Sequence, residues 1–164
     1  MRGVAGRGSR ATAGPVPVKE SVALLIEPPD AAGSATWLLV RRPPDDDELA
    51  GVWGLPAGSL RPGETLETLV RRVGLDKLGV ELRPGATLAE GDRDRPGYRL
   101  RMRLCAAELV VGEPTVPQPT PGVTQYCDWV WGTARALVPG AAAGSLCCAL
   151  ALELAREGTA ELDG

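Results

Sequence analysis

The stretch Leu55–Val80 reads LPAGSLRPGETLETLVRRVGLDKLGV, and the interpretation of the whole chain starts from it. Its first part, up to Gly63, is rich in glycine and proline, which indicates a loop. A helix is predicted from about Thr65 to Leu78, because Thr65 can cap its start and Gly79 can end it. Apolar residues recur there at helical spacing, at Leu66, Leu69, Val70 and Val73. The stretch is therefore predicted to be a loop followed by an amphipathic helix.

The spacing of its glycines and charges is specific. Five residues separate Gly58 from Glu64, seven separate Glu64 from Arg72, and Gly79 follows in the same register. This pattern resembles the signature of the Nudix family, which is G, five residues, E, seven residues, then R-E-U-x-E-E-x-G-U with U aliphatic. The segments that precede it, Arg41–Pro44 and Trp53–Gly58, also resemble the usual approach to this signature.

The resemblance covers roughly residues 20–157 and implies an α/β fold. The expected architecture is the Nudix-like α/β/α sandwich, in which a mixed sheet lies between the signature helix and a C-terminal helix. Residues 1–19 are expected to be a disordered N-terminal tail and residues 158–164 a C-terminal tail, flanking a Nudix-like domain over residues 20–157.

The helix departs from the signature where family members carry carboxylates. Val73 and Lys77 replace two glutamates, Asp76 replaces a third, and Gly74 stands at the aliphatic position. In the family, the carboxylates matching positions 73 and 77 belong to the core magnesium-binding set. Residues three and four apart share a helix face, so carboxylates there can hold divalent cations that neutralise a diphosphate and activate water. We therefore expect the ordinary metal chemistry to be impaired.

The resemblance implies roles for the remaining signature residues. Gly58, Arg72 and Gly79 match structural positions, and Arg72 is expected to pair with Glu64 or with a backbone carbonyl. Ala57 matches a position whose backbone carbonyl can touch metal in relatives. If a magnesium or manganese site has been rebuilt, its expected ligands are Glu64, Asp76 and an outside carboxylate, for which Glu90 is the candidate. Glu64 and Asp76 are then the candidate catalytic residues; the alternative is that no metal binds.

Lys77 has two interpretations. Its ammonium could stand where a magnesium ion would lie and pair with a phosphate, which would preserve anion binding without metal. Alternatively, Lys77 is a surface lysine paired with Asp76 or Glu81. The two interpretations predict different surroundings for the ammonium group.

Further substrate-binding candidates lie outside the helix. In Tyr98–Leu104 (YRLRMRL), the alternating Arg99, Arg101 and Arg103 would line one face of a strand and could grip phosphate groups. The alternative is a solvated face paired with acidic residues of a neighbouring strand. Arg42 and Trp53, which precede the signature, complete the candidate set, and Trp53 is the ring expected to face a ligand.

The rest of the chain is predicted to be mostly strands. Ser21–Glu27 and Thr36–Arg42 are expected to form a hairpin. The sequence further indicates a short strand at Ala86–Glu90, a charged turn at Gly91–Gly97, strands at Tyr98–Val111 and Val123–Trp131, and a helix over Ser145–Glu157 that Gly158 ends.

Composition excludes several classes of protein. The chain has 164 residues, a formal net charge of −3 and no histidine, so a general nucleic-acid binder is disfavoured and histidine chemistry is absent. The four cysteines form no C-x-x-C pair and are expected to be buried free thiols of a cytoplasmic protein; a disulfide or a catalytic cysteine is the alternative. The most apolar run, Ala141–Leu152, is too short to span a membrane. Sixteen arginines against two lysines suggest a GC-rich, actinobacterial-like genome.

Three functions remain open at this stage. The nominal family activity is metal-dependent hydrolysis of a nucleoside diphosphate linked to another moiety. A second hypothesis is a non-hydrolytic Nudix-like pseudoenzyme that binds a nucleotide or another anionic ligand. A third is a repurposed, metal-independent biosynthetic enzyme. All three expect a phosphorylated small molecule as partner, and a homodimer is a further expectation because dimers are common among relatives.

Overall fold

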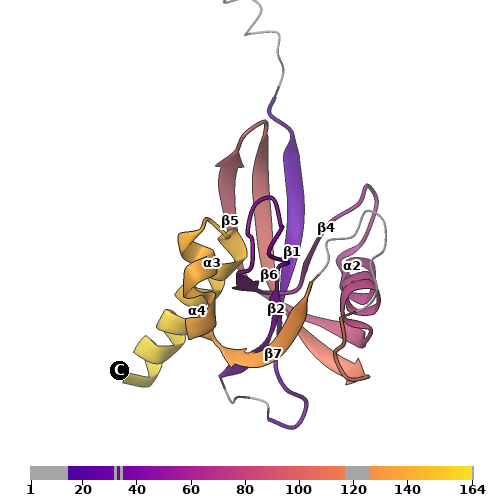
Figure 1. The fold of residues 1–164 in the computed structure, drawn as a ribbon, viewed down its shortest axis with the longest axis vertical. Helices are drawn as coiled ribbons and strands as arrows, with labels where there is room; N and C mark the ends of the chain where they lie inside the picture. Colours follow the sequence, from indigo (N-terminus) through magenta and orange to yellow (C-terminus); the bar gives the residue numbers. More distant parts are fainter. Residues whose placement is uncertain (1–14, 32, 34, 117–125, 164) are drawn as a thin grey trace, which may run out of the picture.

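The computed structural model describes residues 15–31, 33, 35–116 and 126–163, which form two sheets and flanking helices (Figure 1). The larger sheet has the order β4 (Ala57–Ser59), β1 (Val18–Ile26), β6 (Tyr98–Val111), β5 (Glu81–Arg95). The smaller sheet has the order β3 (Trp53–Gly54), β2 (Thr36–Arg41), β7 (Asp128–Thr133). Because β1 runs parallel to β6 and antiparallel to β4, the larger sheet is mixed.

Helices cover both faces of the larger sheet. The signature helix comprises α2 (Leu66–Val73) and a π-helical turn η1 (Gly74–Leu78), and it lies on one side of the sheet in Figure 1. On the other side lie α3 (Val138–Ala142) and α4 (Leu146–Asp163), which follow the 3-10 turn η2 (Ala134–Leu137). None of the helices in the described part of the chain is long and apolar enough to cross a membrane.

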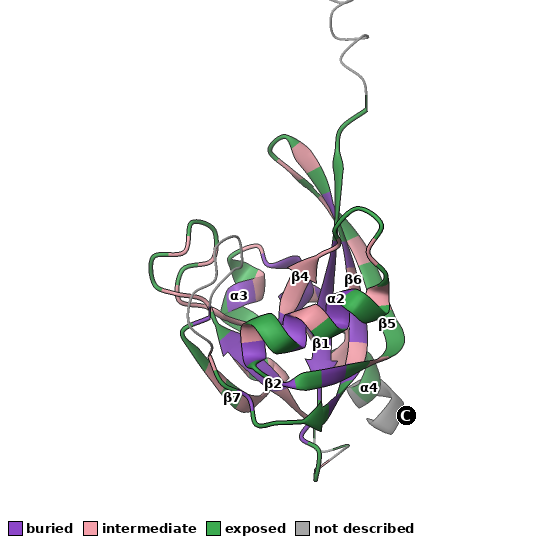
Figure 2. Ribbon diagram, turned by 90° about the vertical axis from the view of Figure 1, so that its right-hand side faces the viewer, coloured by how far each residue is buried: buried purple, intermediate pink, exposed green. Residues whose placement is uncertain are grey.

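Strand β1 is the centre of this arrangement. Every residue from Ser21 to Ile26 is buried, as the purple segment of β1 in Figure 2 shows. Val22, Leu24 and Ile26 pack into the core that includes α2, whereas Ala23 and Leu25 pack into the core that includes α4. Successive side chains of a strand point to opposite faces, so an unbroken apolar run requires cover on both sides. The predicted α/β/α sandwich with a mixed sheet is confirmed.

The predicted hairpin of the first two strands is wrong. Strand β1 pairs with β4 and β6, whereas β2 pairs with β3 and β7 in the other sheet. The chain leaves the first sheet at Pro28–Pro29, where the rings remove two backbone N–H donors and fix φ. Both edges of β1 are already occupied, so β2 finds its partners elsewhere.

The predicted turn at Gly91–Gly97 is also wrong over most of its length. Strand β5 is continuous from Glu81 to Arg95, and only Pro96 and Gly97 form the turn into β6. The acidic residues that suggested a turn each face an arginine across the ladder: Glu90 is opposite Arg103, Asp92 opposite Arg101 and Asp94 opposite Arg99. Opposite charges directly across a ladder stabilise pairing, so these charges extend the strand.

Two helix predictions need correction. The signature helix does not remain α-helical to Leu78, because it widens into the π turn at Gly74, where an added Cβ would lie 2.8 Å from Leu82 Cγ. Helix α4 does not end at Gly158 but continues to Asp163, since one exposed glycine costs a helix only about 1 kcal/mol. The last strand is shorter and later than predicted, at Asp128–Thr133, and residues 123–125 of that prediction lie outside the described residues.

The central position of β1 predicts a large stability effect for Leu24. Leu24→Ala should lower the free energy of unfolding by about 2–5 kcal/mol, because its side chain is 0% exposed. Val111→Ala on the neighbouring β6, where the side chain is 59% exposed, is the control and should change it by less than about 0.5 kcal/mol. Urea denaturation measures both, and equal losses would contradict the two-sided burial of β1.

Candidate functional site

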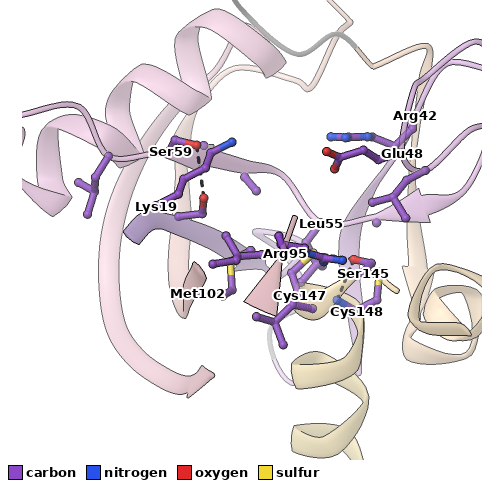
Figure 3. Close-up of a pocket in the computed structure, with 18 of the residues that line it drawn as sticks. Lys19, Arg42, Glu48, Leu55, Ser59, Arg95, Met102, Ser145, Cys147 and Cys148 are labelled. Carbon is purple, nitrogen blue, oxygen red and sulfur yellow. Dashed lines mark hydrogen bonds between the residues drawn. The ribbon is translucent and has the colours of Figure 1, made fainter. Parts of the chain in front are cut away.

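A cavity of about 510 Å³ lies beside β4, between the signature loop and the start of α4 (Figure 3). Six basic residues from distant parts of the chain line it, against the single carboxylate of Glu48. They are Lys19, Arg42, Arg61, Arg72, Lys77 and Arg95. The chain as a whole is acidic, with a formal net charge of −3, so this concentration of positive charge is local. Such a cavity attracts an anion.

Strand register brings one wall of the cavity together. Lys19 and Ser21 of β1 lie opposite Leu100 and Met102 of β6, and all four side chains line the cavity. The cavity therefore lies on the face of the larger sheet that α4 covers. Residues Ala57–Ser59 of β4 form its edge next to β1.

Lys77 reaches the cavity from the π turn. Its Nζ donates a hydrogen bond of 2.5 Å to the backbone oxygen of Ala57 and lies 5.5 Å from the ring centroid of Tyr126. Burial, together with repulsion from Arg42 and Arg72, lowers the pKa of Lys77 to about 8. No carboxylate of the described residues forms an ion pair with it. The interpretation as a surface lysine paired with Asp76 or Glu81 is therefore wrong.

The Ala57 backbone is held from two directions. The hydroxyl of Tyr126 accepts a hydrogen bond of 3.1 Å from Ala57 N and lies 3.4 Å from Ala57 O, to which it can donate. Tyr126 is buried, and burial raises its pKa to about 12, so the hydroxyl stays protonated. The carbonyl that Lys77 contacts is thus fixed in position.

Glu64 and Arg72 form an ion pair that joins the signature loop to α2. Arg72 Nε and Nη2 each donate to Glu64 at 2.9 Å, and Nη2 also donates to Ser59 O at 2.9 Å. The backbone N–H of Arg61 donates to Glu64 as well. These hydrogen bonds, chiefly those of Arg72, lower the pKa of Glu64 to about 2. Arg72 thus has both kinds of partner that the sequence suggested.

The Val73 side chain packs into the core instead of facing the cavity. It is 1% exposed and belongs to the apolar cluster beneath α2. It also touches the signature loop, since a Cβ added to Gly58 would lie 2.8 Å from Val73 Cγ2. Gly58 and Val73 therefore fit closely, and this contact sets how near the loop lies to the helix.

Residues 19–137 match the family model of the NUDIX domain. The chain belongs to the Nudix family. Solved structures agree in fold: the MutT protein from Methanosarcina mazei Go1 has a TM-score of 0.64 at 20% identity, covering 87% of this chain and 96% of that one. The E. coli ORF135 protein has a TM-score of 0.55 at 26% identity, covering 76% and 82% of the two chains. No curated protein sequence matches the chain.

The carboxylates of this Nudix domain do not fit a divalent cation. Both oxygens of Glu64 accept hydrogen bonds, from Arg72 and from the backbone of Arg61, and Asp76 is exposed and does not line the cavity. Glu90 lies on β5, 3.4 Å from Arg103, and is not a lining residue either. Within the described ranges, no group of three metal-ligating side chains is close enough to hold an ion. The predicted ligands are thus not brought together.

The three arginines of β6 share one face, as predicted, but it is the face away from the cavity. The cavity is lined by the even-numbered Leu100 and Met102, and strand geometry directs the odd-numbered residues to the other side. There Arg99 and Arg101 contact Asp92 at 3.5 and 3.4 Å, while Arg103 contacts Glu90. This is the alternative of a solvated face paired with a neighbouring strand.

Of the two candidates before the signature, one reaches the cavity. Arg42 lines it, with Nη2 3.3 Å from Asp46 and with a buried Nε that has no hydrogen-bond partner among the described residues. Trp53 is not a lining residue and packs against the core on the α4 side. The ring that does line the cavity is Tyr98.

Sequence reasoning missed Lys19, Arg95 and the residues at the start of α4. Lys19 was assigned to the N-terminal tail, because the first strand was expected to begin at Ser21. The strand begins at Val18, so Lys19 and Ser21 lie on the same face of it. Arg95 donates to Gly144 O at 2.8 Å, a contact between segments far apart in the sequence. Ser145, Cys147 and Cys148 also line the cavity, and only the tertiary fold brings them there.

The thiols differ from one another. Cys105, Cys147 and Cys148 are buried and free, as predicted, whereas Cys127 is exposed. Ser145 Oγ lies 3.4 Å from Cys147 Sγ at the start of α4. A hydrogen bond from the Cys148 thiol, with further bonds from Ser145 and the Leu55 backbone, lowers the pKa of Cys147.

The low pKa of Glu64 predicts a pH-dependent contribution to stability. A carboxyl whose pKa falls from its ordinary 4.5 to about 2 on folding stabilises the native state above pH 4.5 and loses that effect as the pH falls through 2. After allowance for solvent screening, we expect Glu64→Gln to lower the free energy of unfolding at pH 7 by roughly 2 kcal/mol. The difference from the native protein should shrink below pH 4.5.

Glu67→Gln is the matched control, because Glu67 pairs with Arg71 on the exposed face of the same helix. It should change the free energy of unfolding by less than about 0.5 kcal/mol at any pH. Urea denaturation between pH 7 and 2 measures both variants. A Glu64→Gln effect that is independent of pH would contradict the ion pair.

Proposed function

We propose that this Nudix domain binds a phosphorylated small molecule in the cation-lined cavity without metal-dependent hydrolysis. The observation that carries the proposal is the hydrogen bond from Lys77 Nζ to Ala57 O. Ala57 stands at a position of the Nudix signature where the backbone carbonyl of relatives can contact the metal. An ammonium group of the chain would therefore take the part that a divalent cation has in relatives, pairing with a phosphate.

Hydrogen-bonding capacity supports this role. An ammonium group has three donors, and one of them is used by Ala57 O. The remaining capacity of Lys77 is available to phosphate oxygens. The positive charge lies in a half-buried position, where it acts on an anion more strongly than in bulk water.

The other lining cations support it as well. Arg42 and Arg72 are paired with Asp46 and Glu64. Lys19, Arg61 and Arg95 have no ion pair with a carboxylate of the described residues. An unneutralised group of cations around one cavity is unfavourable without an anion, so a bound phosphate would relieve it.

The first test is binding of inorganic pyrophosphate with a chelator present, measured by titration calorimetry. We expect binding without metal, and Lys77→Met should weaken it about 10- to 100-fold, the usual effect of losing a charged hydrogen bond. Arg71→Met removes an exposed cation of α2 that pairs with Glu67 outside the cavity, and it should leave affinity unchanged. Unaltered affinity in Lys77→Met would contradict the proposal.

The pKa of Lys77 gives a second prediction. The ammonium of Lys77 loses its proton near pH 8. From pH 7 to pH 9, the affinity of the native protein for pyrophosphate should therefore fall more than that of the Lys77→Arg variant. The guanidinium of that variant stays charged over the whole range, so it corrects for titration of pyrophosphate itself. An affinity ratio between the two proteins that does not change with pH would show that Lys77 does not hold the anion.

Metal-dependent hydrolysis remains the alternative, because the solved relatives include proteins named as Nudix hydrolases. It is tested by phosphate release from nucleoside diphosphate derivatives and nucleoside triphosphates, with magnesium, manganese or chelator. We expect no metal-stimulated release. Turnover that requires metal would overturn the proposal and make Glu64, Asp76 and Glu90 the ligands to substitute.

A further inference from the structure

Most of the uncharged side chains that line the cavity are apolar. The larger ones come from both sheets, the loop between β2 and β3, the signature loop and α4: Val40, Leu49, Val52, Leu55, Leu60, Leu100, Met102 and Leu146. Among the described lining residues, the only aromatic ring is that of Tyr98, and Lys19 Nζ lies 5.8 Å from its centroid. A nucleobase is ordinarily held by stacking on aromatic or guanidinium planes. Four guanidiniums also line the cavity, but those of Arg42, Arg72 and Arg95 are held by Asp46, Glu64 and Gly144 O, which leaves Arg61 as the lining guanidinium without such a partner among the described residues.

The other rings of the chain are engaged elsewhere. Trp129 and Trp131 pack edge to face, with centroids 6.1 Å apart, against the α2-side core. Trp37 and Trp53 pack against the α4-side core, and Tyr126 is buried with its hydroxyl at the Ala57 backbone. None of these five rings lines the cavity.

The wall lacks several side chains that commonly read the edge of a base, since the described lining residues include no Asn, Gln, Thr or Asp. Its serine hydroxyls already have partners: Ser21 Oγ and Ser59 Oγ are 3.3 Å apart, and Ser145 Oγ accepts from Cys148 N. Hydrogen bonds to a base edge would therefore come from the cations, Glu48, the Tyr98 hydroxyl or the backbone.

The cations and the apolar residues are arranged around one space. In the view of Figure 3, Lys19 and Arg42 lie on opposite sides, and Leu55, Met102 and Cys147 lie below and between them. The thioether and the thiol are soft groups that adapt to a flexible apolar chain. A phosphate near Lys19 and Lys77 would leave a hydrocarbon chain against this floor.

From this wall we infer that the ligand is a phosphate or diphosphate ester of an aliphatic chain, not a nucleotide. The inference rests on the proposed function, since it names the ligand class of the same cavity. The cations would hold the phosphate, and the aliphatic wall would remove the chain from water.

The experiment compares ligands with one phosphate and different bodies. Butyl, hexyl and octyl phosphate and AMP are titrated calorimetrically with chelator present, below the concentrations at which the alkyl phosphates form micelles. Affinity should rise about threefold for each added methylene, and octyl phosphate should bind at least about tenfold more tightly than AMP. Octyltrimethylammonium, which has the same chain and the opposite charge, should not bind.

Two variants separate the head group from the chain. Met102→Gln, similar in size but polar, should weaken octyl phosphate about five- to tenfold more than it weakens pyrophosphate, and measurable pyrophosphate binding would show that the variant is folded. Leu88→Gln on β5, 39% exposed and not a lining residue, should change neither. Lys77→Met should weaken both ligands by the same factor.

Each outcome has one meaning. Pyrophosphate binding with a flat alkyl series, or AMP binding as tightly as octyl phosphate, overturns this inference and leaves the proposed function standing. Failure of pyrophosphate and of every phosphate ester to bind overturns both.

Discussion

The guanidinium of Arg72 joins three parts of the molecule whose relative position determines the cavity. It donates to both oxygens of Glu64 in the signature loop and to the backbone of Ser59 in β4, while its own backbone belongs to α2. A bidentate pair of this kind fixes orientation as well as distance. Because β4 pairs with β1, the same contact ties the signature helix to the central strand of the larger sheet. The Ala57 carbonyl and the end of the signature helix are thus held in a fixed relative position.

Within the Nudix fold, the residues at the signature positions of the helix determine which groups face the core, the cavity and the solvent. Val73 fills the space next to Gly58 and adds to the core. The π turn that follows brings Lys77 to the cavity and leaves Asp76 exposed. An ammonium attached to the chain differs from a divalent cation in two ways: it carries half the charge, and it can be neutralised by loss of a proton. The charge of Lys77 therefore depends on pH over the range set by its lowered pKa.

The charged β5–β6 ladder shows a different use of the same residue types. Arg99, Arg101 and Arg103 face carboxylates across the ladder, so their charges are balanced locally and exposed to solvent. Lys19 and Arg95 lie close to them in sequence or in register, yet they line the cavity and form no ion pair with a carboxylate of the described residues. Basic residues therefore support the proposal of an anion site only where the fold leaves them without a carboxylate partner.

The sequence by itself determined the family, the α/β/α architecture, the signature loop and helix, and the loss of carboxylates at positions 73 and 77. These follow from local spacing and from apolar runs, which act over a few residues. The partners of β2, the full length of β5, the side of β6 on which the arginines lie and the surroundings of Lys77 were decided by the tertiary structure. Strand pairing and side-chain direction depend on contacts between residues far apart in sequence, such as Lys77 with Ala57 and Arg95 with Gly144. Spacing along the chain does not encode which of two strand faces is covered, because that depends on where the helices pack.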